Sequence, residues 1–174
     1  ARFGLYSTAR KTSPTSTVVN FIDMPYIAVN STPTSVASGT YSNASGRAVG
    51  LLASAASFPW LHCIASATLS VAGSTRTVAL TLSGCTNNYD GTGAPSGTAI
   101  TVTTPTITLT TTDNVSFTVS GNPTFTFGGT TFTPTSFRGD FQLAGTASAT
   151  EIVGRLYMTD GSGVQGTLAF GVLQ

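Results

Sequence analysis

The chain has 174 residues, of which 53 are Ser or Thr, seven Lys or Arg and six Asp or Glu, and its net charge is +1. An ordinary soluble domain is about one quarter charged, whereas this chain is 7% charged and 40% hydrophobic. These values fit one domain with its own core and exclude a basic face for nucleic acid. Residues 48–60, the longest apolar stretch, contain Gly, Ser and Pro and are too short and mixed to span a membrane.

The chain divides into an N-terminal arm, residues 1–17, and a single predicted β domain, residues 18–174. The arm begins with alternating apolar residues, with Phe3 and Leu5 on one face, and continues as a polar segment. Such an arm can add a strand to a neighbouring copy or fold back on its own domain, and the pattern leaves both open. Residues 18–22 are typical of a strand.

The next segments are a loop and one helix. Residues 31–45 are rich in Ser, Thr, Pro and Gly, as loops are. Residues 48–57 place five small or aliphatic side chains at helical spacing, and Pro59 ends the pattern. We expect a short helix there that lies close against a sheet.

Two alternating segments, residues 63–71 and 77–83, flank a glycine-containing turn and predict a hairpin. Pairing Leu69 with Leu80 brings both apolar faces to one side. In that register Cys63 stands opposite position 86, one residue beyond Cys85.

A β-bulge near Gly84 would absorb this slip and place both thiols on one face. We therefore expect a disulfide between Cys63 and Cys85 that clamps the open end of the hairpin in an oxidising compartment. Two buried free thiols are the alternative.

The rest of the chain alternates between apolar and polar residues over short stretches. Phe125 and Phe132 flank Gly128-Gly129, which predicts a hairpin. Further strands are predicted at residues 99–104, 106–112, 115–120, 137–143, 152–158 and 164–172. About ten short strands with at most one helix indicate an all-β fold, an antiparallel sandwich or barrel.

Candidate catalytic residues are few. His62 is the single histidine, and its position at the start of a strand favours a structural role. Asp90, Asp113 and Asp160 lie in turns, where Asp typically binds its own backbone. We predict no catalytic residue, no metal site and no cofactor, and therefore no enzyme.

One carboxylate pair remains as an alternative. Asp140 and Glu151 lie on neighbouring predicted strands and could converge as in a glycosidase. Arg138 and Arg155 lie beside them, however, which favours ion pairing on the surface.

The aromatic residues and sequons give weaker indications. The Phe residues follow strand alternation and are predicted to lie in the core, so a carbohydrate-binding surface would have to use Trp60, Tyr41 or Tyr89. Asn-x-Ser/Thr sequons make Asn30, Asn43 and Asn114 glycosylation candidates if the host glycosylates.

The composition predicts an extracellular structural or adhesive protein that assembles with copies of itself. Strands covered by Thr rather than Lys or Glu tolerate edge pairing with another chain. The first residues lack the basic and apolar regions of a signal peptide, as expected of a secreted chain after its removal. The candidate subunit-contact residues are the apolar ones of the two terminal strands, Phe3, Leu5, Val164, Leu168, Phe170 and Val172.

The alternative is a monomeric surface barrel that binds a host protein, a glycan or a small ligand. Phe-Arg-Gly-Asp-Phe at 137–141, Ala-Thr-Glu-Ile-Val-Gly-Arg-Leu at 149–156 and Gly-Thr-Leu-Ala-Phe-Gly at 166–171 carry a family resemblance. This segment resembles the closing strands of transferrin-binding-protein-like surface barrels. The resemblance implies a barrel on a Gram-negative cell surface that binds host proteins or haem carriers.

Overall fold

The computed structural model describes residues 2–7, 22–27, 36–52, 60–88, 96–113, 116–144 and 151–174. Every regular element in these ranges is a β-strand, so the predicted all-β class is confirmed. The strands are β1 (Arg2–Ser7), β2 (Ile22–Ile27), β3 (Gly39–Tyr41), β4 (Arg47–Leu52), β5 (Leu61–Ala72), β6 (Thr75–Asn88), β7 (Ser96–Ala99), β8 (Thr101–Thr103), β9 (Thr106–Thr111), β10 (Thr118–Ser120), β11 (Thr124–Phe127), β12 (Thr130–Phe132), β13 (Pro134–Ala144), β14 (Glu151–Asp160) and β15 (Gln165–Leu173).

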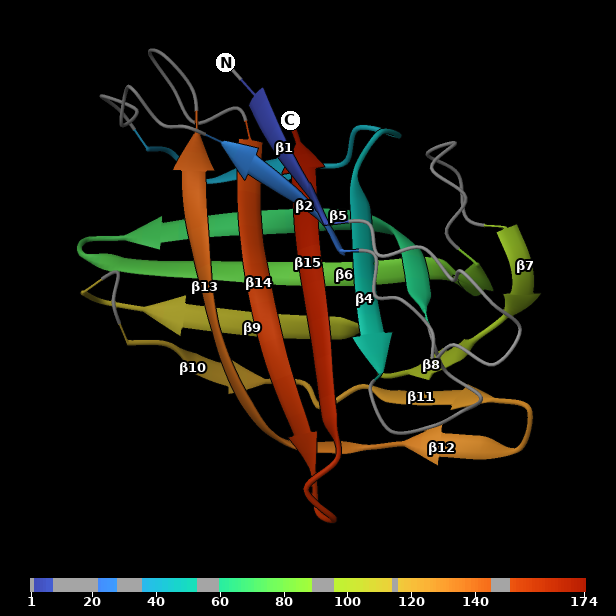
Figure 1. Cartoon of the computed structure of the whole chain (residues 1–174). Helices are drawn as coiled ribbons and strands as arrows, with labels where there is room; N and C mark the ends of the chain where they lie inside the picture. Colours follow the sequence, from blue (N-terminus) through green and yellow to red (C-terminus); the bar gives the residue numbers. More distant parts are fainter. Residues whose placement is uncertain are drawn as a thin grey trace.

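One antiparallel sheet in the order β10-β9-β6-β5-β4-β15-β14-β13 forms most of the molecule, with β3 beside β5 and β7 beside β6. Figure 1 shows β13, β14, β15 and β4 crossing a second layer made of β5, β6, β9 and β10. The sheet therefore folds over on itself and nearly closes, as expected of a sandwich or barrel. A smaller sheet, β12-β11-β8, lies at one end of the two layers.

The helix predicted over residues 48–57 is wrong for its first part, because residues 47–52 form strand β4. Residues 53–57 lie outside the described residues. Ala48 and Leu52 are both buried, and a spacing of four residues lies on one face in a strand as well as in a helix. These residues form a strand rather than a helix because β4 pairs with both β15 and β5.

Gly50 explains how β4 fits at this corner of the sheet. It pairs with Leu61, the first residue of β5, on one side and with Leu168 of β15 on the other. A Cβ atom at this position would collide with the carbonyl oxygen of Thr167. Glycine thus permits the close approach of two backbones where the sheet bends.

The β5–β6 hairpin forms as predicted, but its register differs. Leu69 pairs with Val78 rather than with Leu80, so the predicted register is wrong by two residues. The reason is the turn: Gly73, with φ 61°, occupies the first position of a two-residue connection. A longer loop would have shifted the pairing toward the predicted one.

The predicted disulfide and bulge are both confirmed. The ladder slips by one residue between His62 and Ile64, opposite Gly84, which has φ 56°. Cys63 and Cys85 are bonded across this bulge with an S–S distance of 2.01 Å. The disulfide therefore joins the start of β5 to the end of β6.

Turn chemistry sets two more connections. Gly128 and Gly129, with φ 55° and 79°, make the tight β11–β12 turn that the sequence predicts. Asp160 Oδ1 accepts hydrogen bonds from the backbone N–H groups of Ser162 and Val164, both at 2.8 Å, and so holds the β14–β15 turn.

The other predicted strands are confirmed with small changes. The strands expected at 106–112, 137–143, 152–158 and 164–172 correspond to β9, β13, β14 and β15. The strand expected at 99–104 is divided at Ile100, because β7 pairs with β6 whereas β8 pairs with β11. β10 covers only the end of 115–120, and of 18–22 only Ile22, the first residue of β2, is described.

The core lies between the two layers and is built from alternate strand residues. Its largest fully buried side chains are Tyr41, Phe125, Phe170, Leu52, Leu61, Leu69, Leu80, Ile107, Leu109, Ile152 and Leu156. On the outward face of β6 and β9, threonine hydroxyls pair across the strands, Thr77 with Thr110 at 3.3 Å and Thr81 with Thr106 at 3.0 Å. The Thr-rich outer surface is thus held by cross-strand hydrogen bonds.

The strand pair β1–β2 is a separate two-stranded sheet outside the main one. β2 lies close to β14, β15 and β4, and Figure 1 shows the pair crossing β15 near the chain termini. Val153 and Ala169 point away from the core at this place, yet each is only 6% exposed. The pair therefore covers part of the outward face of its own chain.

Candidate functional site

The first candidate site is the seam, defined as the facing edges of β10 and β13. The main sheet ends at these two strands, and within the described ranges no backbone ladder joins them. β13 is 11 residues long and, among the described strands, pairs with β14 alone, whereas β10 has three residues. An edge strand of this length presents a row of backbone groups that can pair with another chain.

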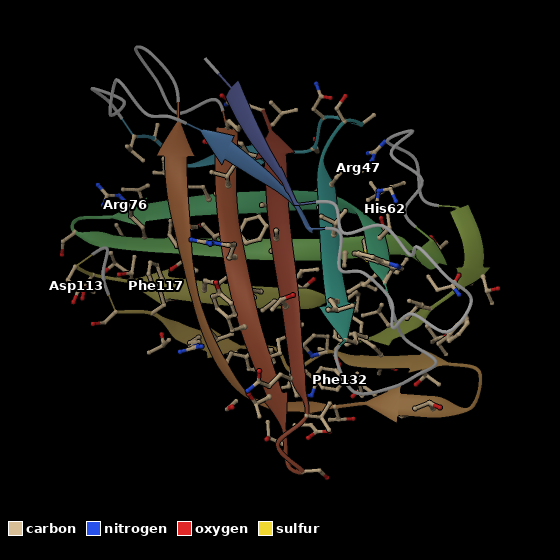
Figure 2. The ribbon with its side chains drawn as sticks, in the orientation of Figure 1. Arg47, His62, Arg76, Asp113, Phe117 and Phe132 are labelled. Carbon is tan, nitrogen blue, oxygen red and sulfur yellow. A yellow bond between two sulfur atoms is a disulfide. The ribbon has the colours of Figure 1, made fainter. Side chains whose placement is uncertain are left out.

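Side chains close the seam instead of backbone hydrogen bonds. Phe117, just before β10, meets Phe141 of β13 edge to face, with ring centroids 5.1 Å apart. Figure 2 shows Phe117 in the region where the two layers meet. Phe141 is 9% exposed and belongs to the core. This aromatic contact joins the two edges through side chains, without a backbone ladder between their described residues.

The predicted subunit-contact residues fall in different environments. Leu168, Phe170 and Val172 are fully buried, and β15 is paired on both edges, so these three belong to the core of their own chain. Val164 is half-buried at the β14–β15 turn. A subunit contact through β15 would require this strand to leave both partners, which disfavours the C-terminal strand as a connector.

The arm of residues 1–17 is described at β1 only. Phe3 pairs with Tyr26 and Leu5 with Met24 of β2, so β1 lies against its own chain. Its role as a donor strand stays a prediction.

The second candidate site is a groove on the outward face of β13, β14 and β15, near the β14–β15 turn. It encloses a hollow of about 280 Å³. Its outward-facing lining forms two rows across the three strands, Ser136, Thr159 and Gln165 in one row and Arg138, Tyr157 and Thr167 in the other. β1 and β2 lie toward the other end of these strands in Figure 1.

An arginine and a tyrosine dominate this groove. The guanidinium carbon of Arg138 lies 4.9 Å from the centre of the Tyr157 ring, a cation–π contact. Tyr157 is 37% exposed, one of two exposed large hydrophobic side chains among the described residues, and the other is Ile64. Tyr157 gives no functional signal in the sequence, because in a strand pattern it is simply an outward residue.

Of the predicted carbohydrate-binding aromatics, the two that are described do not form an exposed surface. Tyr41 is buried in the core, and this burial raises the pKa of its hydroxyl. Trp60 is half-buried before β5, and Tyr89 lies outside the described residues.

The acidic residues do not converge. Asp140 stands opposite Arg155 in register, whereas Glu151 stands opposite Ala144, four residues along the ladder. The rise of a strand separates these rows by about 13 Å, beyond the about 5–9.5 Å that glycosidase carboxylates need. This register favours the ion-pairing interpretation over a glycosidase pair.

The turn aspartates bind backbone as expected where they can be seen. Asp113 Oδ1 accepts from the N–H of Ser116 at 2.7 Å, and Asp160 holds its turn as described above. Asp90 lies outside the described residues. Among the described residues no three His, Cys, Asp or Glu side chains gather as a metal site would require.

His62 and Arg47 lie toward the same end of the sheet in Figure 2. His62 is completely buried and stands between Val49 of β4 and Thr86 of β6 in register. Arg47 donates to the carbonyl oxygens of Ala44 and Gly46, at 2.6 and 2.8 Å. These contacts fit structural roles within the sheet.

Of the glycosylation candidates, Asn43 is described. It is exposed in the β3–β4 turn, and its Oδ1 accepts from the N–H of Ser45 at 2.9 Å. Asn30 and Asn114 lie outside the described residues.

No helix in the described part of the chain is long and apolar enough to cross a membrane. No known protein family matches the chain, and neither a curated protein nor a solved structure shows significant similarity to it.

Proposed function

We propose that the chain is a non-catalytic structural or adhesive protein of an extracellular surface, which assembles with copies of itself into a filament by β-strand addition. The observation that carries this proposal is the seam. β13 offers a long edge that faces β10 without a ladder in the part of the chain described. A strand from a second copy would find backbone groups to pair with there, and its alternating side chains would set the register.

The proposed donor is β1. Its own partner is β2, in a two-stranded sheet separate from the main one, and such a pair is at best marginally stable by itself. If β1 moves to the seam of a neighbouring copy, a ladder with β13 of that copy replaces the ladder with β2. Phe3 and Leu5 lie on one face of β1, and this face would be buried in the neighbour. Because donor and acceptor lie on different parts of the chain, the contact is heterologous, and its repetition gives an open filament when the rotation between neighbouring copies does not close a ring.

The surface supports the same proposal. The Cys63–Cys85 disulfide is typical of an oxidising compartment, and paired Thr hydroxyls replace charged side chains on the outward face of β6 and β9. An exposed Asn43 leaves its sequon accessible if the host glycosylates.

Deletion of residues 1–12 tests the donor. We expect filaments of the intact chain in negative-stain micrographs and monomers of the truncated chain in sedimentation velocity. A synthetic peptide of residues 1–12 should occupy the seam and shorten wild-type filaments. Polymerisation of a truncated chain that keeps its far-UV circular dichroism would show that the arm is not the connector.

A matched pair of variants separates loss of assembly from loss of folding. Phe3→Ser with Leu5→Ser removes the apolar face of β1, whereas Tyr6→Ser changes the other face. We expect the double variant to remain monomeric and the Tyr6→Ser variant to assemble. If the double variant assembles as well as the Tyr6→Ser variant, the face of β1 that carries Phe3 and Leu5 is not buried in a neighbouring copy.

A second candidate function is a single surface barrel that binds a host protein, a glycan or a small ligand. The groove around Tyr157 supports it, and the segments that resemble transferrin-binding-protein-like barrels lie in or beside β13, β14 and β15, which line that groove. Size-exclusion chromatography distinguishes the two functions, since a compact monomer at high concentration contradicts assembly.

A further inference from the structure

We propose that the groove on β13, β14 and β15 binds an acidic sugar, a saccharide unit that carries a carboxylate, with Arg138 as the residue that recognises the carboxylate. This inference gives the second candidate function a site and a ligand class. It does not depend on assembly, because one chain supplies the whole groove.

The charge of the lining selects for an anion. Arg138 is the only charged residue among those that line the groove. Its guanidinium lies over the Tyr157 ring with its centre 4.9 Å away. A guanidinium held by a cation–π contact keeps N–H donors in its own plane, and these can bind a carboxylate in a bidentate manner. The tyrosine thus orients the arginine.

The remaining lining suits a ligand rich in hydroxyl groups. Ser136, Thr159, Gln165 and Thr167 each offer a donor and an acceptor, as sugar hydroxyls do. Tyr157 adds the exposed part of an aromatic ring, the kind of surface on which the C–H groups of a sugar pack. The volume of about 280 Å³ lies at the small end of ligand sites, which fits one sugar unit.

Asp160, the nearby acid whose side chain is described, is held by its own turn. Asp160 Oδ1 accepts from two backbone N–H groups of its own turn, and Asp140 stands opposite Arg155 in the ladder. The strands hold the six outward residues in two registered rows, so the site is built on rigid elements rather than on loops.

The experiment compares two ligands that differ only in the carboxylate, methyl glucuronide and methyl glucoside, by NMR titration of the labelled intact chain. We expect saturable shifts of groove amides with the glucuronide and binding at least tenfold weaker with the glucoside. Arg138→Ala should weaken glucuronide binding at least tenfold, and Arg138→Lys, which keeps the charge but not the planar fork, should weaken it by a smaller factor. Arg155→Ala, an arginine on the same outward face but outside the groove, should change it less than twofold.

Three outcomes would overturn the proposal. Equal binding of the glucoside would show that no carboxylate is recognised, and displacement by inorganic sulfate at equal concentration would show a simple anion site. Shifts that survive Arg138→Ala in a chain with unchanged circular dichroism would place the binding elsewhere. None of these results bears on filament formation, which is read separately in micrographs.

Discussion

The β5–β6 hairpin and the seam belong to the same sheet, yet they are closed by different means. In the hairpin a tight turn closes one end, a disulfide closes the other, and both strands have ladders on each side. At the seam, two edge strands meet through the Phe117–Phe141 contact. The difference teaches that stability is concentrated in the centre of the sheet, while its edges retain backbone groups for another strand.

The largest expected effect concerns the shared core. Phe170 is fully buried on β15, and Phe170→Ala should lower the free energy of unfolding by about 4 kcal/mol, because it leaves a cavity. Urea unfolding measures this loss. Ser70→Ala, at an exposed position of β5, should change stability by less than about 0.5 kcal/mol. A loss of less than about 1 kcal/mol for Phe170→Ala would contradict a packed core between the layers.

The disulfide gives the next effect and tests the closed side of the comparison. The two cysteines are 22 residues apart, and a crosslink of this length stabilises by about 3 kcal/mol, largely by restricting the unfolded chain. Reduction of the wild type and the double variant Cys63→Ala, Cys85→Ala should both show this loss in urea unfolding. If the seam alone governs assembly, filaments should still form below the lowered midpoint. If the reduced chain stays folded but no longer assembles, the disulfide of the hairpin affects the seam.

Local chemistry made the hairpin predictable from sequence. Gly73, the Gly128-Gly129 pair and Asp160 each act on neighbours within a few residues, and their turns were found where expected. The disulfide followed from a hairpin pattern and a glycine able to form a bulge. Even so, the register was wrong by two residues, because alternation repeats every second residue and only the turn length fixes the pairing.

The β4 strand and both candidate sites could not be predicted, for a physical reason. Ala48 and Leu52 fit strand and helix equally, and the choice depends on β15, more than a hundred residues away. The seam depends on which strands end without a partner, a property of the whole sheet. The groove depends on the register of three strands, which places Arg138 beside Tyr157 and Thr167, and no pattern within one strand contains that information.

A smaller effect measures how firmly the seam is closed. A double-mutant cycle of Phe117→Leu and Phe141→Leu should give a coupling of about 1 kcal/mol, as edge-to-face aromatic pairs do. The same cycle on Phe125 and Phe132, whose ring centroids are 6.4 Å apart, is the matched control within the smaller sheet. If Phe117 is a closure that opens for a donor strand, Phe117→Leu should also speed binding of the peptide of residues 1–12. If the peptide binds at an unchanged rate although the Phe117–Phe141 coupling is about 1 kcal/mol, the aromatic contact plays no part in strand addition.

The smallest effect tests whether threonine pairs, rather than threonine alone, hold the outer surface. The Thr81 and Thr106 hydroxyls are 3.0 Å apart across β6 and β9, and a cycle of Thr81→Val and Thr106→Val should give a coupling of about 0.5 kcal/mol. The ladder supplies a control on the β6 side, since Thr108 stands opposite Ala79 there, while Ser120 of β10 stands on its other side. In a Ser120→Ala background, which removes the hydroxyl on the β10 side, Thr108→Val should therefore be neutral or stabilising, because valine packs well in a strand. Equal losses at Thr106 and Thr108 would mean that the hydroxyls act through solvent, and the Thr-rich face would then serve solubility rather than cohesion of the sheet.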